Sequence, residues 1–382
     1  MSYQESDPSR KRRGAVLMIG AFPPPLTGAA LINERIAHQL RQFAHVKTIN
    51  VSPVNLDRNW HYHFTRLSRM CLAFGLLLRH SREFNVVYIS LSGGLGQAYD
   101  LILIAVARIF GYALFIHHHS FAYVDKRSPM FALIGKIGGY RALHICLCSH
   151  MATKLKATYG SVSRTITVSN AALVGSPRRR RSPRRDVIVL GHMSNLMPEK
   201  GIDTVLETVQ RCMAAKLPVR LVVAGPMLGS SIRDMIVAAQ AKFGPVLEYR
   251  GPIYGSDKDK FFEDIDIFLF PTRYENEAQP LVVLESLAAG VPVVAMARGC
   301  IADDLGDVGS VAFEPEEFIR HVLYMVSQAL KSPDWLRKTS DRVRRHVRAL
   351  SLISEQAFEQ LAKKVVATAN ARNDSEEDFL DH

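Results

Sequence analysis

The stretch RYENEAQPLVVLESLAAGVPVVA, residues 273–295, carries most of the information about the fold of this 382-residue chain. Pro280 suits the first position of a helix, where a missing N–H costs nothing. Gly290 suits the end of that helix, and Pro292 prevents the helix from resuming. The β-branched run that follows is typical of a buried strand. The stretch therefore predicts a loop, a helix and a strand of an α/β domain.

Two acidic residues lie on either side of the start of this helix. Glu277 and Glu285 have seven residues between them, which places Glu285 about two turns into the helix. Acids favour the first turn of a helix for electrostatic reasons alone. A carboxylate inside an otherwise apolar helix, however, is rarely buried without a partner. With a phosphate-binding helix N-terminus between them, the two carboxylates could bracket a ligand about as long as a nucleotide sugar.

The rest of the chain reads as two α/β halves without an internal repeat. Short β-branched runs alternate with helical patterns, which predicts parallel sheets. The expected strands of the first half are 15–19, 86–91, 113–117, 144–148 and 165–168. Those of the second half are 187–190, 220–224, 247–249, 265–270 and 292–295.

The stretch 273–295 resembles the donor site of the retaining, GT-B-fold glycosyltransferases of family 4. The resemblance implies that Glu277 contacts the donor sugar and that Glu285 holds the ribose. Pro280 stands where the family usually has glycine, which leaves the N–H groups of Ala278, Gln279 and Leu281 for phosphate. It also implies an α/β GT-B fold, with two Rossmann-like parallel-sheet domains facing a cleft and a C-terminal helix that crosses back to the first domain.

The expected domain organisation combines this resemblance with composition. Residues 175–186 are rich in Ser, Pro and Arg, as is typical of a linker, and the end of the chain is acidic. We predict a basic tail 1–14, an acceptor-side domain 15–174, the linker 175–186, a nucleotide-sugar-binding domain 187–345, a crossover helix 346–372 and an acidic tail 373–382.

Further motifs extend the resemblance. Lys200-Gly201 matches a family Lys-Gly at a βα turn, where a lysine suits a diphosphate. Asn195 occupies the place of the usual arginine and can donate to phosphate without supplying charge. Gly28 follows a Pro-rich loop after the first strand, where it is either a plain turn glycine or a point of close phosphate approach. In place of a family Gly-Gly-x-x-Glu the chain has Gly299, then Cys300 for the second glycine and Asp303 for the glutamate.

Three consecutive histidines end an expected strand. Strand alternation places His117 and His119 on one face and His118 on the other, at the edge where open α/β sheets bind ligands. The resemblance places a histidine that approaches the donor sugar here, with His119 as the first choice and His117 as the second. Zinc binding by this run, or by the alternating His144, Cys146, Cys148 and His150, is disfavoured by geometry.

Composition limits the remaining possibilities. The net charge of +12 is concentrated in two clusters, Arg10–Arg13 and Arg178–Arg185. Such clusters are usually solvated, and anionic lipid is a better candidate partner than nucleic acid. Five scattered cysteines and no visible signal peptide favour the cytoplasm. The apolar helix expected at 67–78 is read as a buried helix, with an interfacial docking helix as the alternative.

We therefore expect a glycosyltransferase that moves a sugar from a nucleotide diphosphate sugar to an acceptor hydroxyl with retention, in surface polysaccharide or glycolipid assembly. The acceptor is expected to be a saccharide or a lipid-linked saccharide, at the inner membrane face or in the cytoplasm. The expected catalytic residues are Glu277, His119 and Lys200. No Asp-x-Asp motif lies near them, so no metal or other cofactor is expected. The alternatives are a nucleotide-sugar epimerase on the same fold and a non-catalytic protein that binds membrane or nucleic acid.

Overall fold

The computed structural model describes residues 14–24, 28–52, 60–81, 83–174, 186–332 and 334–377, with backbone alone at 60–63 and 372–377. Both predicted basic clusters, and the linker apart from Asp186, lie outside these residues. The chain divides into two compact units. Unit 1 comprises the residues up to Ser169 together with those from Gln356 onwards, and unit 2 is Asn170–Glu355. Each unit is described by itself.

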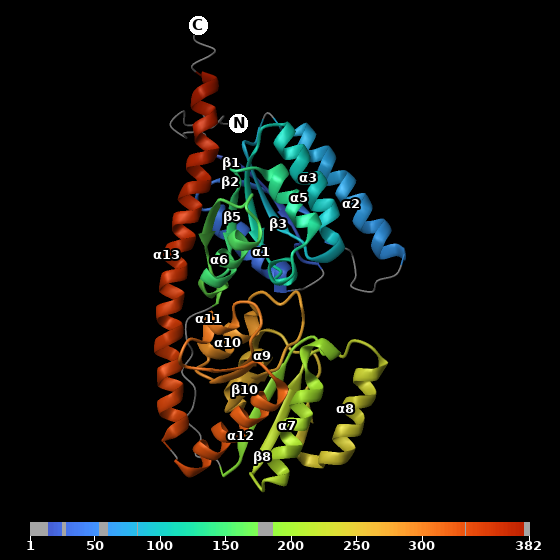
Figure 1. The fold of residues 1–382 in the computed structure, drawn as a ribbon, viewed down its shortest axis with the longest axis vertical. Coiled ribbons are helices and arrows are strands. Elements are labelled where there is room, and N and C mark those ends of the chain that lie inside the picture. Colours follow the sequence, from blue (N-terminus) through green and yellow to red (C-terminus); the bar gives the residue numbers. More distant parts are fainter. Residues whose placement is uncertain are drawn as a thin grey trace, which may run out of the picture. The chain divides into compact units, whose positions relative to one another are not determined.

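Unit 1 is built on a parallel sheet of six strands in the order β2-β1-β3-β4-β5-β6 (Figure 1). The strands are β1 (Ala15–Gly20), β2 (His45–Asn50), β3 (Val86–Leu91), β4 (Ala113–His118), β5 (Leu143–Cys146) and β6 (Arg164–Thr167). The α-helices between them are α1 (Gly28–Leu40), α2 (Trp60–Arg79), α3 (Gln97–Ile109), α4 (Ala122–Asp125), α5 (Pro129–Gly138) and α6 (Ser149–Thr158). A 3-10 turn, η1 (Gly94–Gly96), precedes α3.

Unit 2 repeats this architecture with the strand order β12-β11-β10-β7-β8-β9. Its strands are β7 (Ile188–Met193), β8 (Val219–Ala224), β9 (Leu247–Tyr249), β10 (Ile267–Phe270), β11 (Val293–Met296) and β12 (Ser310–Ala312). Its helices are α7 (Ile202–Ala214), α8 (Ser230–Phe243), α9 (Gly255–Asp264), α10 (Leu281–Ala288), α11 (Ile301–Leu305) and α12 (Pro315–Lys331). Its 3-10 turns are η2 (Asn170–Leu173), η3 (Pro198–Lys200) and η4 (Gly244–Val246).

The last helix, α13 (Trp335–Glu377), belongs to both units. Val343 and Val347 pack in the core of unit 2. Further along, the Asn85 side chain donates to the Ala369 carbonyl oxygen at 3.0 Å within unit 1. The predicted crossover helix is therefore confirmed, although it begins at Trp335 rather than at His346 and runs into the expected acidic tail. The two parallel sheets and this helix confirm the predicted α/β, GT-B-type fold.

The ten expected strands are all present, although their ends differ by up to three residues from the predicted ones. The expected strand 144–148 ends early, because the chain leaves β5 at Cys146 and Cys148 becomes the N-cap of α6. His144, Cys146, Cys148 and His150 therefore do not share one strand face as expected. Two strands, β2 and β12, were not predicted, and both lie at sheet edges.

The sheet of unit 2 has an apolar core on each face. One core joins α7, α8 and α12 to the sheet through side chains such as Ile202, Ile232 and Phe318. The other joins α9, α10 and α11 through Phe261, Val283 and Ile301. Because all strands are parallel, the loops that follow β7, β10 and β11 leave the sheet at the same edge, and β10 lies between the other two. The candidate site lies at this edge.

Candidate functional site

Lys200 and Glu277 meet at this edge of unit 2. Lys200 ends the η3 turn after β7, and Glu277 lies in the loop between β10 and α10. The Lys200 ammonium forms an ion pair with the Glu277 carboxylate, and both side chains are largely buried, with 14% and 11% of their surface exposed. The Thr272 hydroxyl donates to the same carboxylate at 3.1 Å. The structure thus brings together two of the three predicted catalytic residues.

Aromatic rings surround the ammonium of Lys200. Its nitrogen lies 4.8 Å from the centroid of the Tyr274 ring and 5.8 Å from that of Phe270. Ring faces attract cations at this range. Neither aromatic residue was predicted as part of the site, because the sequence shows no spacing that would link them to Lys200.

Two glycines allow the loops at this edge to pack closely. Gly201 adopts φ +78°, and a Cβ there would lie 2.1 Å from the Pro271 carbonyl oxygen. Gly299 adopts φ +57°, and a Cβ there would lie 2.1 Å from the Ala278 carbonyl oxygen. The loops that carry Lys200 and Glu277 therefore touch through backbone that leaves no room for a side chain.

Arg273 adds a second connection between these loops. Its backbone N–H donates to the Glu199 carbonyl oxygen at 2.7 Å. Its guanidinium contacts both carboxylate oxygens of Asp203 at 2.9 Å. Arg273 thus holds the turn that ends in Lys200 against the loop that carries Glu277.

Glu285 lies on α10, paired with a lysine that was not predicted from the sequence. The Lys258 ammonium is 2.6 Å from each oxygen of the Glu285 carboxylate, and both side chains are partly buried. Pro280 is the N-cap of α10, whereas the sequence predicted it as the first helical residue. Glu285 lies four residues after Leu281, which at 3.6 residues per turn is about one turn into the helix rather than the expected two. The carboxylate inside the apolar helix does have the partner that burial requires.

The residues at the start of α10 present backbone donors. In the part of the chain that the structure describes, no backbone carbonyl accepts from the N–H groups of Ala278 or Leu281. The side chain of Gln279 is buried and bonds within unit 2: it accepts from the Asn170 N–H at 2.7 Å and donates to Asp304 at 2.6 Å. These bonds hold the Gln279 side chain against η2 and α11.

Asp304 is a buried acid that was not predicted as part of the site. Burial raises the pKa of its carboxyl well above the usual range, although the hydrogen bond from Gln279 opposes this shift. The neighbouring Asp303, which was expected to replace a family glutamate, is exposed. Asn195, the expected substitute for an arginine, is exposed in the loop after β7.

The histidines of unit 1 follow the predicted alternation. The ring centroids of His117 and His119 are 4.1 Å apart, whereas His118 stacks on His144 with a centroid distance of 5.2 Å. The Tyr88 hydroxyl and His117 Nδ1 are 2.7 Å apart. Among the described residues, Nε2 of His117 and of His119 are buried without a hydrogen-bond partner. Burial lowers the pKa of His119 to about 4, so its ring is neutral at neutral pH.

Gly28 begins α1 in unit 1. A Cβ at this position would meet no atom within 4 Å. The packing of the described residues therefore does not require glycine here, and the space beside the backbone stays open.

Two further polar contacts of unit 1 hold the protein's own structure together. Asp100, beside the Gly93–Gly96 turn, is buried and accepts from the Ser92 N–H at 2.7 Å, so this turn is stabilised by the protein itself. His118 Nε2 lies 3.0 Å from His144 Nδ1. No group of three or more His, Cys, Asp or Glu side chains among the described residues is arranged to hold a metal ion.

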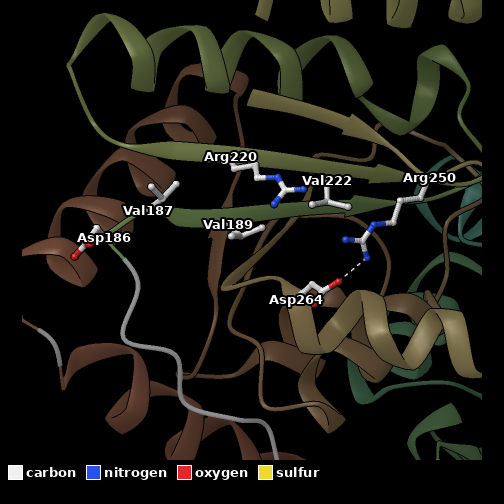
Figure 2. Close-up of a pocket in the computed structure, with 7 residues that line it drawn as sticks. All are labelled: Asp186, Val187, Val189, Arg220, Val222, Arg250 and Asp264. Atoms are coloured by element: carbon white, nitrogen blue, oxygen red, sulfur yellow. Dashed lines mark ion pairs between the residues drawn. The ribbon is translucent and has the colours of Figure 1, made fainter. Parts of the chain in front are cut away.

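A pocket of about 570 Å³ lies elsewhere in unit 2, on the sheet face near β7, β8 and the end of α9 (Figure 2). Arg250 points across it to Asp264, and the two form an ion pair of 2.8 Å. Arg250 and Arg220 also both pair with Glu248. Both arginines of this pocket are thus held in ion pairs within the protein, and no predicted site residue lines it.

Unit 2 matches a known family. Residues 184–328 match the family model described as "Glycosyl transferases group 1". This match covers the greater part of unit 2. It contains Lys200, Glu277 and Glu285, the residues on which the predicted resemblance depended. No curated protein matches the chain.

Solved structures show the same fold over nearly the whole chain. Anabaena HepE in complex with UDP-glucose has a TM-score of 0.64 at 16% identity, over 92% of this chain and 100% of HepE. Sucrose-phosphate synthase from Thermosynechococcus elongatus has a TM-score of 0.70 at 15% identity, over 93% and 100%. WaaG, a glycosyltransferase involved in lipopolysaccharide biosynthesis, has a TM-score of 0.63 at 14% identity, over 92% and 99%. The chain thus has the two-domain GT-B fold, and residues 184–328 form part of it.

Proposed function

We propose that this protein is a retaining glycosyltransferase that moves a sugar from a nucleotide diphosphate sugar to an acceptor hydroxyl. The observation that carries the proposal is the pairing of Lys200 with Glu277 at the carboxyl edge of the sheet of unit 2, within the residues that match the "Glycosyl transferases group 1" model. A cation and an anion that are held together in a partly buried position suit a ligand with both phosphate and hydroxyl groups. The fold shared with HepE, which was solved with UDP-glucose, supports the same class of donor.

Each residue has a distinct proposed role in the reaction. Lys200 binds the diphosphate, aided by Asn195, by the N–H groups of Ala278, Gln279 and Leu281, and by close approach at Gly28. Together these donors stabilise the charge that grows on the leaving diphosphate. Glu277 binds hydroxyl groups of the donor sugar and positions its ring, and Glu285 holds the ribose. His119, neutral at neutral pH, donates or accepts a hydrogen bond at the sugar.

The proposed reaction forms one bond and breaks one bond at the same face of the sugar. The bond between the anomeric carbon and the diphosphate oxygen breaks, and the bond between that carbon and the acceptor oxygen forms. The acceptor proton passes to the departing diphosphate oxygen. No side chain is proposed as a covalent nucleophile, and positioning supplies much of the remaining rate enhancement.

We further propose that the reaction needs no metal ion. Lys200 and the backbone donors would then supply the charge stabilisation that a divalent cation provides elsewhere. Loss of all activity in EDTA, with recovery on adding Mn²⁺, would contradict this proposal.

The proposed acceptor is a saccharide or lipid-linked saccharide used in surface polysaccharide or glycolipid assembly, in the cytoplasm or at the inner membrane face. The shared fold with WaaG, whose role is in lipopolysaccharide biosynthesis, supports this class. No helix in the described part of the chain is both long enough and apolar enough to cross a membrane.

Calorimetric titration with UDP, GDP, ADP and dTDP tests the proposed function. Binding of one nucleotide by the wild-type protein, weakened by Lys200→Ala, is the expected result. Lys242→Ala is the matched control, because Lys242 is an exposed lysine of the same unit that bonds to Gln210 away from the site. If none of the four nucleotides binds, the donor-site proposal fails.

A further inference from the structure

Helix α2 presents an apolar stripe to solvent. Phe64, Leu67, Cys71, Phe74 and Leu78 are all exposed. They recur every three or four residues, which places them on one face of the helix. Phe64 and Leu67 have 64% and 51% of their surface accessible. The sequence favoured a buried helix here, and for this face that prediction is wrong.

The neighbouring face of α2 explains why the helix forms and stays in place. Met70, Ala73 and Leu77 are buried against unit 1 and lie beside the exposed stripe on the helix surface. The Tyr112 hydroxyl donates to the Leu77 carbonyl oxygen at 2.7 Å. These contacts hold the helix to unit 1 and leave the adjoining apolar stripe exposed to solvent.

Neighbouring helices extend this surface. Helix α3 contacts both α2 and α5, and the three lie next to one another in Figure 1. Ile102 and Ile109 of α3 are exposed, as are Met130 and Leu133 of α5. These exposed apolar residues thus lie on α2 and on the two helices next to it, rather than scattered over the whole unit.

The exposed charges on these three helices have one sign. Helices α2, α3 and α5 contain a single acid, Asp100, and it is buried. The nearest acid in the sequence, Glu83, follows α2; it is exposed and pairs with His80 at 2.7 Å. The exposed charges along the three helices are Arg79, Arg108 and Lys136, with Arg141 shortly beyond α5. A second copy of the chain would bring this same positive charge against itself, whereas an anionic lipid surface would neutralise it.

We propose that the outer face of α2, with the adjoining residues of α3, docks on an anionic bilayer. In this arrangement α2 lies in the plane of the interface, its apolar side chains enter the boundary between headgroups and acyl chains, and the flanking cations contact lipid phosphates. The inference rests on the described surface of unit 1 and does not depend on the proposed reaction. It would bring a lipid-linked acceptor close to the protein without a membrane-spanning helix.

Vesicle flotation of the full-length protein tests the proposal. We expect association with phosphatidylglycerol-rich vesicles and little with pure phosphatidylcholine. The double variant Leu67→Glu/Phe74→Glu is expected to lower the partition coefficient about 100-fold, because it removes two apolar contacts and adds negative charge. The control variant Val237→Glu/Ile353→Glu alters two exposed apolar residues of unit 2 and is expected to bind as wild type.

Several outcomes would overturn the assignment. No association at low salt would remove the bilayer as the occupant, and unchanged association of the double variant would place membrane binding elsewhere in the chain. A wild-type dimer in analytical ultracentrifugation that the double variant dissociates would identify a second copy as the occupant. Circular dichroism and nucleotide titration of the same variants separate loss of docking from loss of folding or of the proposed donor site.

Discussion

Lys200 and Glu277 are 77 positions apart in the sequence and form an ion pair at the carboxyl edge of the second sheet. The pair depends on β7 and β10 being neighbours in that sheet, since each residue lies in the loop after one of these strands. In the absence of donor the two charges neutralise each other. A nucleotide sugar would replace this pairing, with phosphate at Lys200 and sugar hydroxyls at Glu277.

Removing the charge of Lys200 and removing that of Glu277 should therefore have different effects on nucleotide affinity and on turnover. We expect Lys200→Ala to weaken nucleoside diphosphate binding at least about tenfold, because a charge-assisted contact is worth about 1.5–3 kcal/mol. Glu277→Gln should leave nucleoside diphosphate affinity nearly unchanged and lower turnover with the whole sugar nucleotide. Calorimetry and product formation measure the two effects. Equal turnover of Glu277→Gln and wild type would exclude Glu277 from the catalytic residues.

Glu285 and Lys258 allow a test of the proposed ribose contact. The 2.6 Å pairing fixes the Glu285 carboxylate, so Lys258→Met should reduce its ability to hold a ribose hydroxyl. We expect wild type to bind a 2′- or 3′-deoxynucleotide about tenfold more weakly than the ribonucleotide. This difference should shrink in Lys258→Met and vanish in Glu285→Ala. Lys260→Met, on the same helix but exposed, is the control.

A comparison of three glycines separates folding from binding. Gly201→Ala would place a Cβ 2.1 Å from the Pro271 carbonyl oxygen at a positive φ, and we expect it to destabilise the protein by about 1–3 kcal/mol. Gly28→Ala has open space and should leave the melting temperature unchanged while it weakens donor binding. Gly160→Ala, also in open space, should change neither property. Normal donor affinity in Gly28→Ala would remove Gly28 from the proposed site.

The buried histidines predict a loss of stability in acid. Burial lowers the pKa of His119, His144 and His192 to about 4 in the folded protein, against about 6.5 in the unfolded chain. The unfolded state therefore binds more protons as the pH falls from about 6.5 towards 4, and stability decreases over that window. Thermal melts from about pH 7.5 to 4.5 should show a falling midpoint. His192→Gln should make the decrease less steep, and a constant midpoint in wild type would contradict the predicted burial of neutral histidines.

Sequence patterns predicted the secondary structure around the site residues better than they predicted the side-chain contacts of those residues. The strand, turn and helix signals around 273–295 placed Glu277 before a helix and Glu285 inside it, and the structure confirms both placements. Lys258 could not be predicted as the partner of Glu285, nor Tyr274 as a contact of Lys200, because those contacts depend on how α9 and the β10 loop pack. The strand β12 was also missed, although β9, which is equally short, was predicted.

The apolar helix at 67–78 shows what composition alone cannot predict. Its composition predicted an apolar helix correctly, but composition has no information about which face the rest of the domain covers. Met70, Ala73 and Leu77 are buried, whereas the apolar stripe beside them is exposed. Only the packing of α2 against unit 1 distinguishes a buried helix from a docking helix.

Asp304 supplies a final prediction in which the sign of the pH effect is opposite to that of the histidines. Burial raises its pKa, so the folded protein favours the protonated acid and loses stability as the pH rises from the unfolded pKa through the folded one. Asp304→Asn keeps an oxygen that can accept from Gln279 and carries no charge at any pH. We expect the variant to be about 1–3 kcal/mol more stable than wild type at about pH 8, with the difference vanishing near about pH 4. The Asp303→Asn variant, which alters the exposed neighbour, should show no such dependence. A less stable Asp304→Asn protein at the higher pH would mean that the ionised carboxylate stabilises the contact between Gln279 and α11.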